Sequence, residues 1–415
     1  MSRHSLRPCL LIILLSAGCG GSQNGTQLQP SRCVLEHGEL PLNWRAPKGL
    51  SLADSDLPWS EKETEEAYRA MTVGVEEMIS LVKENDTEVK ALWDNSVEAF
   101  IDVAYGLRAD DPLSIMSLSW AIVNLQILVV PYLGSDGVIP TCEVSSEFLT
   151  LAVYAHHLSR RHPETTQLQV MRAQLIERAN QALSQCSSIT EFLGYDPKSI
   201  FATPQQSNEV VYDWLMWSVS LTDALAISEL QLPRGSSEMV RETWKYLSTY
   251  RVPEGTDTPE GLNDTAAYDG AYLMTHVGYL PTGYGRHLLK IKDAPWLYRY
   301  IRENFYAAMK MGELDLFAEF VDLLRQYGCD ETNDRQLRHG SRYLLSLFRR
   351  AGNSWIRHRE SYEEAEITTY DALHKPWTAI SGLKRRSFEP IDASSYGAAF
   401  YRALDPALEK EAAKE

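Results

Sequence analysis

GELDLFAEFVDLLRQYG, residues 312–328, indicates most clearly how this chain folds. Phe317, Phe320 and Leu324 recur at the spacing of one helical face, while Asp315 and Glu319 lie on another. A half-buried strand would instead alternate apolar and polar residues at every second position. The stretch therefore predicts an amphipathic α-helix that ends near Gly328.

The same period recurs along most of the chain after Glu61. Apolar residues repeat at i, i+3, i+4 and i+7 in residues 65–84, 89–107, 114–133, 146–161, 208–230, 296–310 and 335–352. Strand alternation is nearly absent, and helix-stopping residues such as Pro131, Pro163 and Pro233 separate the segments. We therefore predict an all-α protein.

About a dozen helices are too many for one simple bundle around a single core. A helical-hairpin repeat solves this problem, because each hairpin packs on its neighbours in a solenoid or ring. Residues 264–385 resemble the repeats of α/α-toroid proteins, in which a helix ending in a Gly/Trp turn (here 352–355) alternates with an inner helix facing a central cavity. MTHVGYLPTGY, residues 274–284, also resembles a Thr-His-x-x-x-Tyr helix of uncharacterised bacterial proteins. These resemblances imply an α/α toroid or an incomplete ring.

The N-terminus has the features of an export signal. A basic start with Arg3 and Arg7 precedes a short apolar run, and LSAGC then ends at Cys19. LSAGC resembles the lipobox of bacterial lipoproteins, which implies that Cys19 carries lipid and holds the protein to the cell envelope, with the outer membrane favoured over the inner one. An ordinary secretory signal cut nearby is the alternative. We expect a signal peptide at 1–18, a lipidated cysteine and flexible tether at 19–60, a toroid-like helical domain at 61–405 and a charged tail at 406–415.

Charge and cysteine content narrow the possible partners. The net charge of −16 and the pI of 5.2 argue against nucleic acid or an anionic lipid surface, because both would repel the chain. No CxxC pair is present, which argues against a thiolate zinc site. An even number of cysteines outside the signal and the lipobox permits two disulfides. We predict one between Cys142 and Cys186, because they bracket a probable helical hairpin.

Two segments each carry a tyrosine, an aspartate and a histidine on one helical face. Asp269, Tyr272 and His276 are spaced i, i+3 and i+7. They form either a buried polar network or the floor of a pocket in which His276 is a general base or a metal ligand.

In the second segment, Tyr370 and Asp371 precede His374 by four and three residues. Two such helices facing each other across a ring would suit a divalent metal ion or metal-free acid/base chemistry on a sugar. The alternative is that the two histidines are unrelated. There is no HExxH motif, so a standard zincin is excluded.

Residues 312–328 carry further carboxylates. Glu313 precedes the predicted helix, and Asp315, Glu319 and Asp322 share one of its faces. A solvated acidic face is the default interpretation, and an acidic lining of the ring is the alternative. Tyr212 and Trp214 lie on an apolar helix, where they are either core residues or a platform for carbohydrate.

Two functions remain open at the level of sequence. One is an envelope enzyme, a hydrolase or lyase whose ring acts on a glycan or peptide through Tyr, Asp and His side chains. The other is a non-catalytic binding or scaffold lipoprotein of the cell envelope, which the absence of a phosphate loop or a GxSxG elbow favours.

Overall fold

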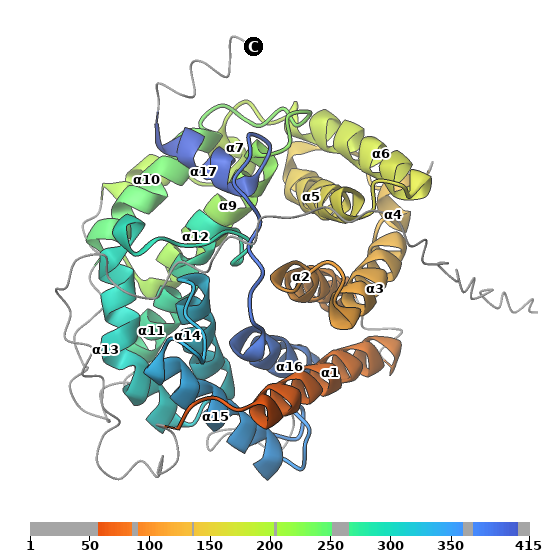
Figure 1. Ribbon diagram of the computed structural model, residues 1–415. Helices are drawn as coiled ribbons and strands as arrows, with labels where there is room; N and C mark the ends of the chain where they lie inside the picture. The colour runs from red at the N-terminus through yellow and green to blue at the C-terminus, as the bar shows by residue number, and fades with distance from the viewer. Residues whose placement is uncertain are drawn as a thin grey trace, which may run out of the picture. The chain divides into compact units, whose positions relative to one another are not determined.

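The computed structural model of the chain is entirely helical where it is described (Figure 1). It describes residues 57–84, 90–134, 137–202, 206–250, 265–359 and 368–405, which all belong to one compact unit within Arg32–Glu415. No β-strand occurs in these ranges, so the all-α prediction is confirmed. The predicted signal peptide, Cys19, most of the predicted tether and the predicted tail lie outside the described residues.

The longer helices of the described ranges alternate between an outer and an inner layer (Figure 1). The outer helices are α1 (Glu61–Glu84), α3 (Pro112–Leu128), α6 (Thr166–Leu183), α10 (Ser236–Thr249), α13 (Pro295–Met311) and α15 (Arg335–Arg350). The inner helices are α2 (Lys90–Gly106), α5 (Ser145–Arg161), α9 (Asn208–Leu225), α11 (Thr265–Val277), α14 (Leu314–Gln326) and α16 (Thr369–Leu383). The shorter elements are α4 (Val130–Leu133), η1 (Cys142–Val144), α7 (Ile189–Leu193), α8 (Pro197–Phe201), α12 (Tyr279–Thr282), η3 (Ile291–Asp293) and α17 (Tyr396–Leu404).

Each inner helix packs on the outer helix that follows it in the chain. The pairs are α2 with α3, α5 with α6, α9 with α10, α11 with α13 and α14 with α15, while α16 packs on the first outer helix, α1. The inner helices also contact one another in chain order, and the last of them, α16, contacts the first, α2. The inner circuit is therefore closed, and the predicted helical-hairpin repeat is an α/α toroid.

The neighbouring inner helices α14 and α16 run in the same direction. Near their N-terminal ends, Asp315 of α14 pairs with His374 of α16. Near their C-terminal ends, Arg325 of α14 donates a hydrogen bond of 2.8 Å to the carbonyl of Gly382 in α16. We call the side of the N-terminal ends the mouth and the side of the C-terminal ends the floor. Residues at similar positions in α14 and α16 consequently lie at similar depths.

Helix α14 is buried on both of its faces. Phe317, Phe320 and Leu324 on its apolar face have no exposed surface. Its acidic residues are also covered, since Glu319 is 3% exposed and Asp322 is 1% exposed. The default interpretation of a solvated acidic face is therefore wrong. The reason is tertiary: α11, α13, α15 and α16 all contact α14.

Local signals set the positions of the inner helices. The hydroxyl of Thr368 accepts a hydrogen bond from the backbone N–H of Asp371 and donates one to its carboxylate, which forms a reciprocal cap at the start of α16. Gly382, near the other end of α16, allows close packing on α14. A Cβ at this position would lie 3.0 Å from the carbonyl oxygen of Ala318 and 2.8 Å from Cδ1 of Leu344.

The predicted disulfide between Cys142 and Cys186 is present, with a Cα–Cα distance of 5.1 Å. It joins residues 44 positions apart, at the two ends of the α5–α6 hairpin. Cys329 is also disulfide-bonded. Among the described helices, none has the length and apolar character needed to cross a membrane.

Candidate active site

Solvent exposure falls steadily along the inward faces of the inner helices, from the mouth to the floor. In α16, Tyr370 is 48% exposed, His374 is 9% exposed, and Lys384, immediately after the helix, has no exposed surface. In α14, the side chain of Asp315 is 22% exposed, whereas Glu319 is 3% exposed. These gradients describe a pocket that solvent enters from the mouth.

Aromatic side chains line this pocket. Tyr212, Tyr272 and Trp377 remain half-buried although an outer layer of helices surrounds the helices that carry them. Ring-to-ring contacts form a continuous chain from the mouth to the floor: Tyr268 contacts Tyr272, Tyr272 contacts Tyr212 and His276, His276 contacts Tyr279, and Tyr279 contacts Tyr284. The centroids of these ring pairs are 4.5 to 6.4 Å apart. The wall along α11 is therefore a surface of stacked rings.

An ion pair lies nearest the mouth. Nδ1 of His374 is 3.1 Å from Oδ1 of Asp315. Tyr370 stacks on the imidazole with a centroid distance of 5.0 Å, and Trp377 contacts it edge-on. Burial disfavours the charged form of both partners, but their mutual attraction outweighs it, so the pKa of His374 is raised and the pKa of Asp315 is lowered. At neutral pH Asp315 is thus ionised.

Glu319 lies one turn deeper in α14, and its pKa is shifted in the opposite direction to that of Asp315. Burial and the nearby charge of Asp315 raise the pKa of Glu319 well above its ordinary value. The hydroxyl of Thr275 lies 2.6 Å from Oε2 of Glu319, which is within hydrogen-bond distance. The surroundings of Glu319 therefore favour its protonated form, beside a carboxylate that is ionised.

His276 borders the same two carboxyl groups. Its Nδ1 lies 2.9 Å from the carbonyl oxygen of Tyr272 and 3.5 Å from Oε2 of Glu319. Burial lowers the pKa of His276 to about 4, so the imidazole is neutral at neutral pH. Since Nδ1–H donates to the carbonyl of Tyr272, Nε2 carries the free lone pair.

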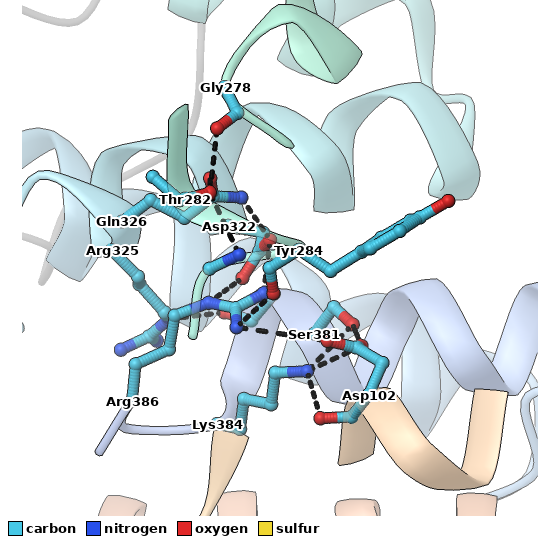
Figure 2. A network of polar contacts seen from close by, with 12 residues as sticks. Asp102, Gly278, Thr282, Tyr284, Asp322, Arg325, Gln326, Ser381, Lys384 and Arg386 are labelled. Atoms are coloured by element: carbon cyan, nitrogen blue, oxygen red, sulfur yellow. Dashed lines mark hydrogen bonds and ion pairs between the residues drawn. The ribbon is translucent and has the colours of Figure 1, made fainter. Parts of the chain in front are cut away.

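The floor is a buried network of ion pairs (Figure 2). Nζ of Lys384 lies 2.6 Å from the carboxylate of Asp102 in α2. Arg386 donates two hydrogen bonds of 2.7 and 2.6 Å to Asp322 in α14. Ser381 of α16 also donates a hydrogen bond to Asp102. Side chains of α2, α14 and α16 are thereby tied together by the segment that follows α16.

A second cluster of buried charged and polar side chains lies between α5 and α9. Asp223 accepts a hydrogen bond of 2.7 Å from Arg286, and its Oδ1 is 3.0 Å from Nε2 of His157. Burial acts against the charge of Asp223, but Arg286 and His157 together lower its pKa far below the ordinary value. A cavity of about 40 Å³ adjoins this cluster, with Glu98 and Tyr284 in its wall. It has room for only a few water molecules.

The structure unites some of the residues singled out in the sequence and leaves others apart. His276, His374, Tyr272 and Tyr370 all lie in the pocket. Asp269 is exposed and forms no hydrogen bond with His276 in the described part of the chain.

Asp269 is therefore not part of the cluster of polar residues that the spacing predicted around His276. Two helical turns separate the residues, and this rise of about 10 Å exceeds the reach of an aspartate. Asp371 is occupied in capping α16, and its charge acts on His374 only from a distance.

The sequence did not show which residues complete the pocket. Asp315 and Glu319 were recognised as sharing a face, but their partners come from α11 and α16. Thr275, Asp102 and Arg386 carried no signal, because their contacts join segments far apart in the chain. Tyr212 lies in the pocket, whereas Trp214 is a core residue that is 1% exposed.

Three side chains could together hold a metal ion. One ligand atom each from Asp315, Glu319 and His374 lies within 4.8 Å of the others. Carboxylate oxygens and an imidazole nitrogen suit Zn²⁺ or Mn²⁺. Binding would require Glu319 to lose its proton and His374 to give up its ion pair with Asp315.

The chain matches no protein-family model, no curated protein and no solved structure. The resemblance of residues 274–284 to a Thr-His-x-x-x-Tyr helix stays untested, and in this chain only two residues separate His276 from Tyr279. The case for a function therefore depends on the pocket itself.

Proposed function

We propose that this protein is a glycan-cleaving hydrolase of the bacterial cell envelope, with its active site in the pocket of the helical toroid. One observation carries the proposal. Asp315 and Glu319, on successive turns of α14, have pKa values shifted in opposite directions at the wall of an aromatic pocket. Two carboxyl groups with pKa values pushed apart are the machinery of glycoside hydrolysis.

Glu319 is the general acid in this proposal. Its carboxyl group gives a proton to the glycosidic oxygen as the bond from that oxygen to the anomeric carbon breaks. Thr275 and His276 hold the carboxyl group from the other side, since both lie against Oε2. A neutral His276 adds no positive charge that would favour loss of the proton.

Asp315 is the nucleophile. One oxygen of each carboxyl group lies within 4.8 Å of one oxygen of the other, and this close approach suits the separation of about 5–5.5 Å between the carboxyl groups of retaining enzymes. Asp315 therefore attacks the anomeric carbon and forms a glycosyl ester. Glu319, now ionised, takes a proton from water, and the resulting hydroxide displaces Asp315 to complete the hydrolysis with retention of configuration.

The pocket wall suits a sugar as substrate. Pyranose rings present C–H faces that pack on aromatic rings, and Tyr212, Tyr272 and Trp377 offer such faces around the carboxyl groups. Both histidines border one carboxyl pair, which is the arrangement expected of an enzyme. In a scaffold protein with unrelated histidines, the two imidazoles would have no reason to border the same pair of carboxyl groups.

A metal-dependent hydrolase is the second candidate, and the proximity of Asp315, Glu319 and His374 favours it. In that case a bound ion would activate water, and Glu319 would be a ligand and not an acid. A chelator separates the candidates, because it leaves acid/base hydrolysis intact and abolishes the metal-dependent reaction.

The experiment is a cleavage screen with the full-length protein purified in detergent. The probes are uncross-linked peptidoglycan strands, lipopolysaccharide O-chains and linear α- and β-glucans, assayed for new reducing ends with and without EDTA. We expect cleavage of at least one probe that EDTA does not reduce and that Glu319→Gln abolishes. Cleavage lost only with EDTA supports the metal-dependent reaction, and no cleavage of any probe supports a non-catalytic binding protein.

A further inference from the structure

A groove of about 500 Å³ lies between the start of α14 and the end of α15. Gly312, just before α14, and Arg350, the last residue of α15, are among the residues that line it. Arg357, His358 and Arg359, in the segment after α15, add further basic side chains. No acidic residue lines the groove, although the chain has a net charge of −16. We call it the arginine groove.

The arginine groove borders the mouth of the pocket. Gly312 precedes Asp315 by three residues, so their Cα atoms are at most about 10 Å apart. The carbonyl oxygen of His358 accepts a hydrogen bond of 3.1 Å from Nζ of Lys375, the residue that follows His374 in α16. Asp315 and His374 form the ion pair nearest the mouth. A glycan that occupies the pocket can therefore continue into the groove.

The three arginines of the groove lack carboxylate partners. No carboxylate in the described part of the chain forms an ion pair with Arg350, Arg357 or Arg359, and all three side chains are exposed. By contrast, the neighbouring Arg349 pairs with Glu66 at 3.1 Å. Since a guanidinium keeps its positive charge at any ordinary pH, the groove favours an anion as its occupant.

Contacts with the rest of the fold hold the groove in shape. The guanidinium of Arg350 lies over the ring of Tyr343, 5.9 Å from its centroid. The segment after α15 is anchored by Trp355, which has no exposed surface and donates a hydrogen bond of 2.8 Å to the carbonyl of Ala70 in α1. A groove that is already formed loses little conformational entropy when a ligand binds.

From these contacts we infer that the substrate is an anionic glycan, one of whose carboxylate or phosphate groups binds in the arginine groove while neighbouring sugars reach the carboxyl pair. The inference rests on the proposed hydrolase function and adds the substrate class. A guanidinium donates two parallel hydrogen bonds to a carboxylate or a phosphate, and a neutral glucan offers it neither group. The acidic remainder of the chain does not prevent this binding, because charges more than about 8 Å apart are largely screened at physiological ionic strength.

The first test measures binding separately from cleavage, by calorimetric titration of the full-length protein in detergent. One pair of probes is oligogalacturonides and their neutral methyl esters, and the other is phosphorylated mannan oligomers before and after removal of phosphate. We expect at least one charged probe to bind about tenfold more tightly than its neutral counterpart, with the difference shrinking as salt is added. The pair with the larger difference identifies the group that is recognised.

The outcomes for the groove and for the hydrolase are distinguishable. Equal affinity for charged and neutral probes, or no binding of any probe, would overturn the inference, while cleavage of neutral glucans would leave the hydrolase function standing. Tighter binding of a charged probe, together with no cleavage in the screen, would support the groove as an anion site and overturn the hydrolase.

The second test changes the groove itself. Arg350→Gln combined with Arg357→Gln should weaken binding of the charged probe about tenfold and leave binding of the neutral probe unchanged. Both side chains are exposed, so the variant should fold. Arg299→Gln is the matched control, because Arg299 is exposed on the outer helix α13. Unchanged binding in the double variant, or an equal loss in the control, would overturn the inference.

The chain also contains a competing anion. Glu363 and Glu364 follow Arg359 in the sequence and lie outside the described residues. Glu363→Gln combined with Glu364→Gln tests whether they occupy the groove. We expect the charged probe to bind the wild type without these substitutions. Binding that appears only in the Glu363→Gln and Glu364→Gln variant would overturn the inference.

Discussion

The carboxyl groups of Asp315 and Glu319 project from successive turns of α14 and have pKa shifts of opposite sign. Asp315 faces the His374 imidazole, whose pKa is raised, at the solvent-exposed end of the pocket, and Glu319 faces a threonine hydroxyl and a neutral imidazole one turn deeper. The same helix therefore presents an acid and a base, because its two turns lie at different depths.

The rate of hydrolysis should fall on both the acidic and the alkaline side of its maximum. Asp315 must be ionised, so the rate falls with acid only as pH drops below the ordinary range for a carboxyl group. Glu319 must be protonated, so the rate also falls when pH rises through its raised pKa. Initial rates measured between pH 3 and pH 10 test this, and a profile without an alkaline limb would contradict the role of Glu319.

The ion pair of Asp315 and His374 should stabilise the fold most in mildly acidic solution. Since folding raises the pKa of His374, its contribution is fully present below the ordinary histidine pKa of about 6.5 and is lost as pH rises through the raised value. His374→Gln should therefore lower the melting temperature more at pH 6 than at pH 9. His162→Gln, which removes a more exposed imidazole after α5, is the control. An equal loss at both pH values would contradict the pairing.

Breaking the floor network should be costly. Arg386→Leu leaves the buried carboxylate of Asp322 without its two hydrogen bonds and should reduce the free energy of unfolding by about 3–5 kcal/mol. Arg108→Leu removes a guanidinium that pairs with Asp110 on the surface, and it should change stability little. Urea unfolding of both variants measures the difference. Similar stabilities would show that the buried pair of Arg386 and Asp322 stabilises the protein no more than the surface pair does.

Close packing of α16 on α14 should not tolerate an added methyl group at Gly382. Its Cβ would lie 3.0 Å from the backbone oxygen of Ala318, so one helix must move. We expect Gly382→Ala to reduce the free energy of unfolding by about 1–3 kcal/mol. Gly134→Ala is the control, because its Cβ would meet only a backbone oxygen at 3.4 Å. Thermal melts of the two variants test whether the added methyl group at Gly382 destabilises the protein more than the one at Gly134.

Removal of Cys19 should release the protein from the membrane. The lipobox-like LSAGC implies a lipid anchor, and Cys19→Ala removes the atom that would carry it. The variant should appear in the soluble envelope fraction, while a Cys9→Ala variant stays in the membrane fraction. Unchanged membrane association of Cys19→Ala would contradict lipid anchoring.

The fold was predictable because helical periodicity is a local property. Phe317, Phe320 and Leu324 repeat at helical spacing, and the structure buries all three. The pocket was only partly predictable. His276 and Tyr272 are one turn apart on α11 and do make contact, but Asp269 is too far along the helix to join them.

What the sequence could not show was the pairing of residues between helices. Glu319 bonds Thr275 on α11, and Asp102 pairs with Lys384 from almost three hundred residues away. The intervening hairpins decide which helices become neighbours. Local patterns contain no information on this order of packing, so the acidic face of α14 could have been either solvated or buried.

The most direct test of the proposed chemistry is the initial rate at which reducing ends form from the polysaccharide that is cleaved. It is measured for the wild type, Glu319→Gln and Asp315→Asn, with Glu303→Gln and Asp269→Asn as controls because these two residues are exposed. The account predicts that each of the first two substitutions lowers kcat by about 10²–10⁴-fold and that the controls stay close to the wild type. Wild-type rates in Glu319→Gln and Asp315→Asn would contradict it.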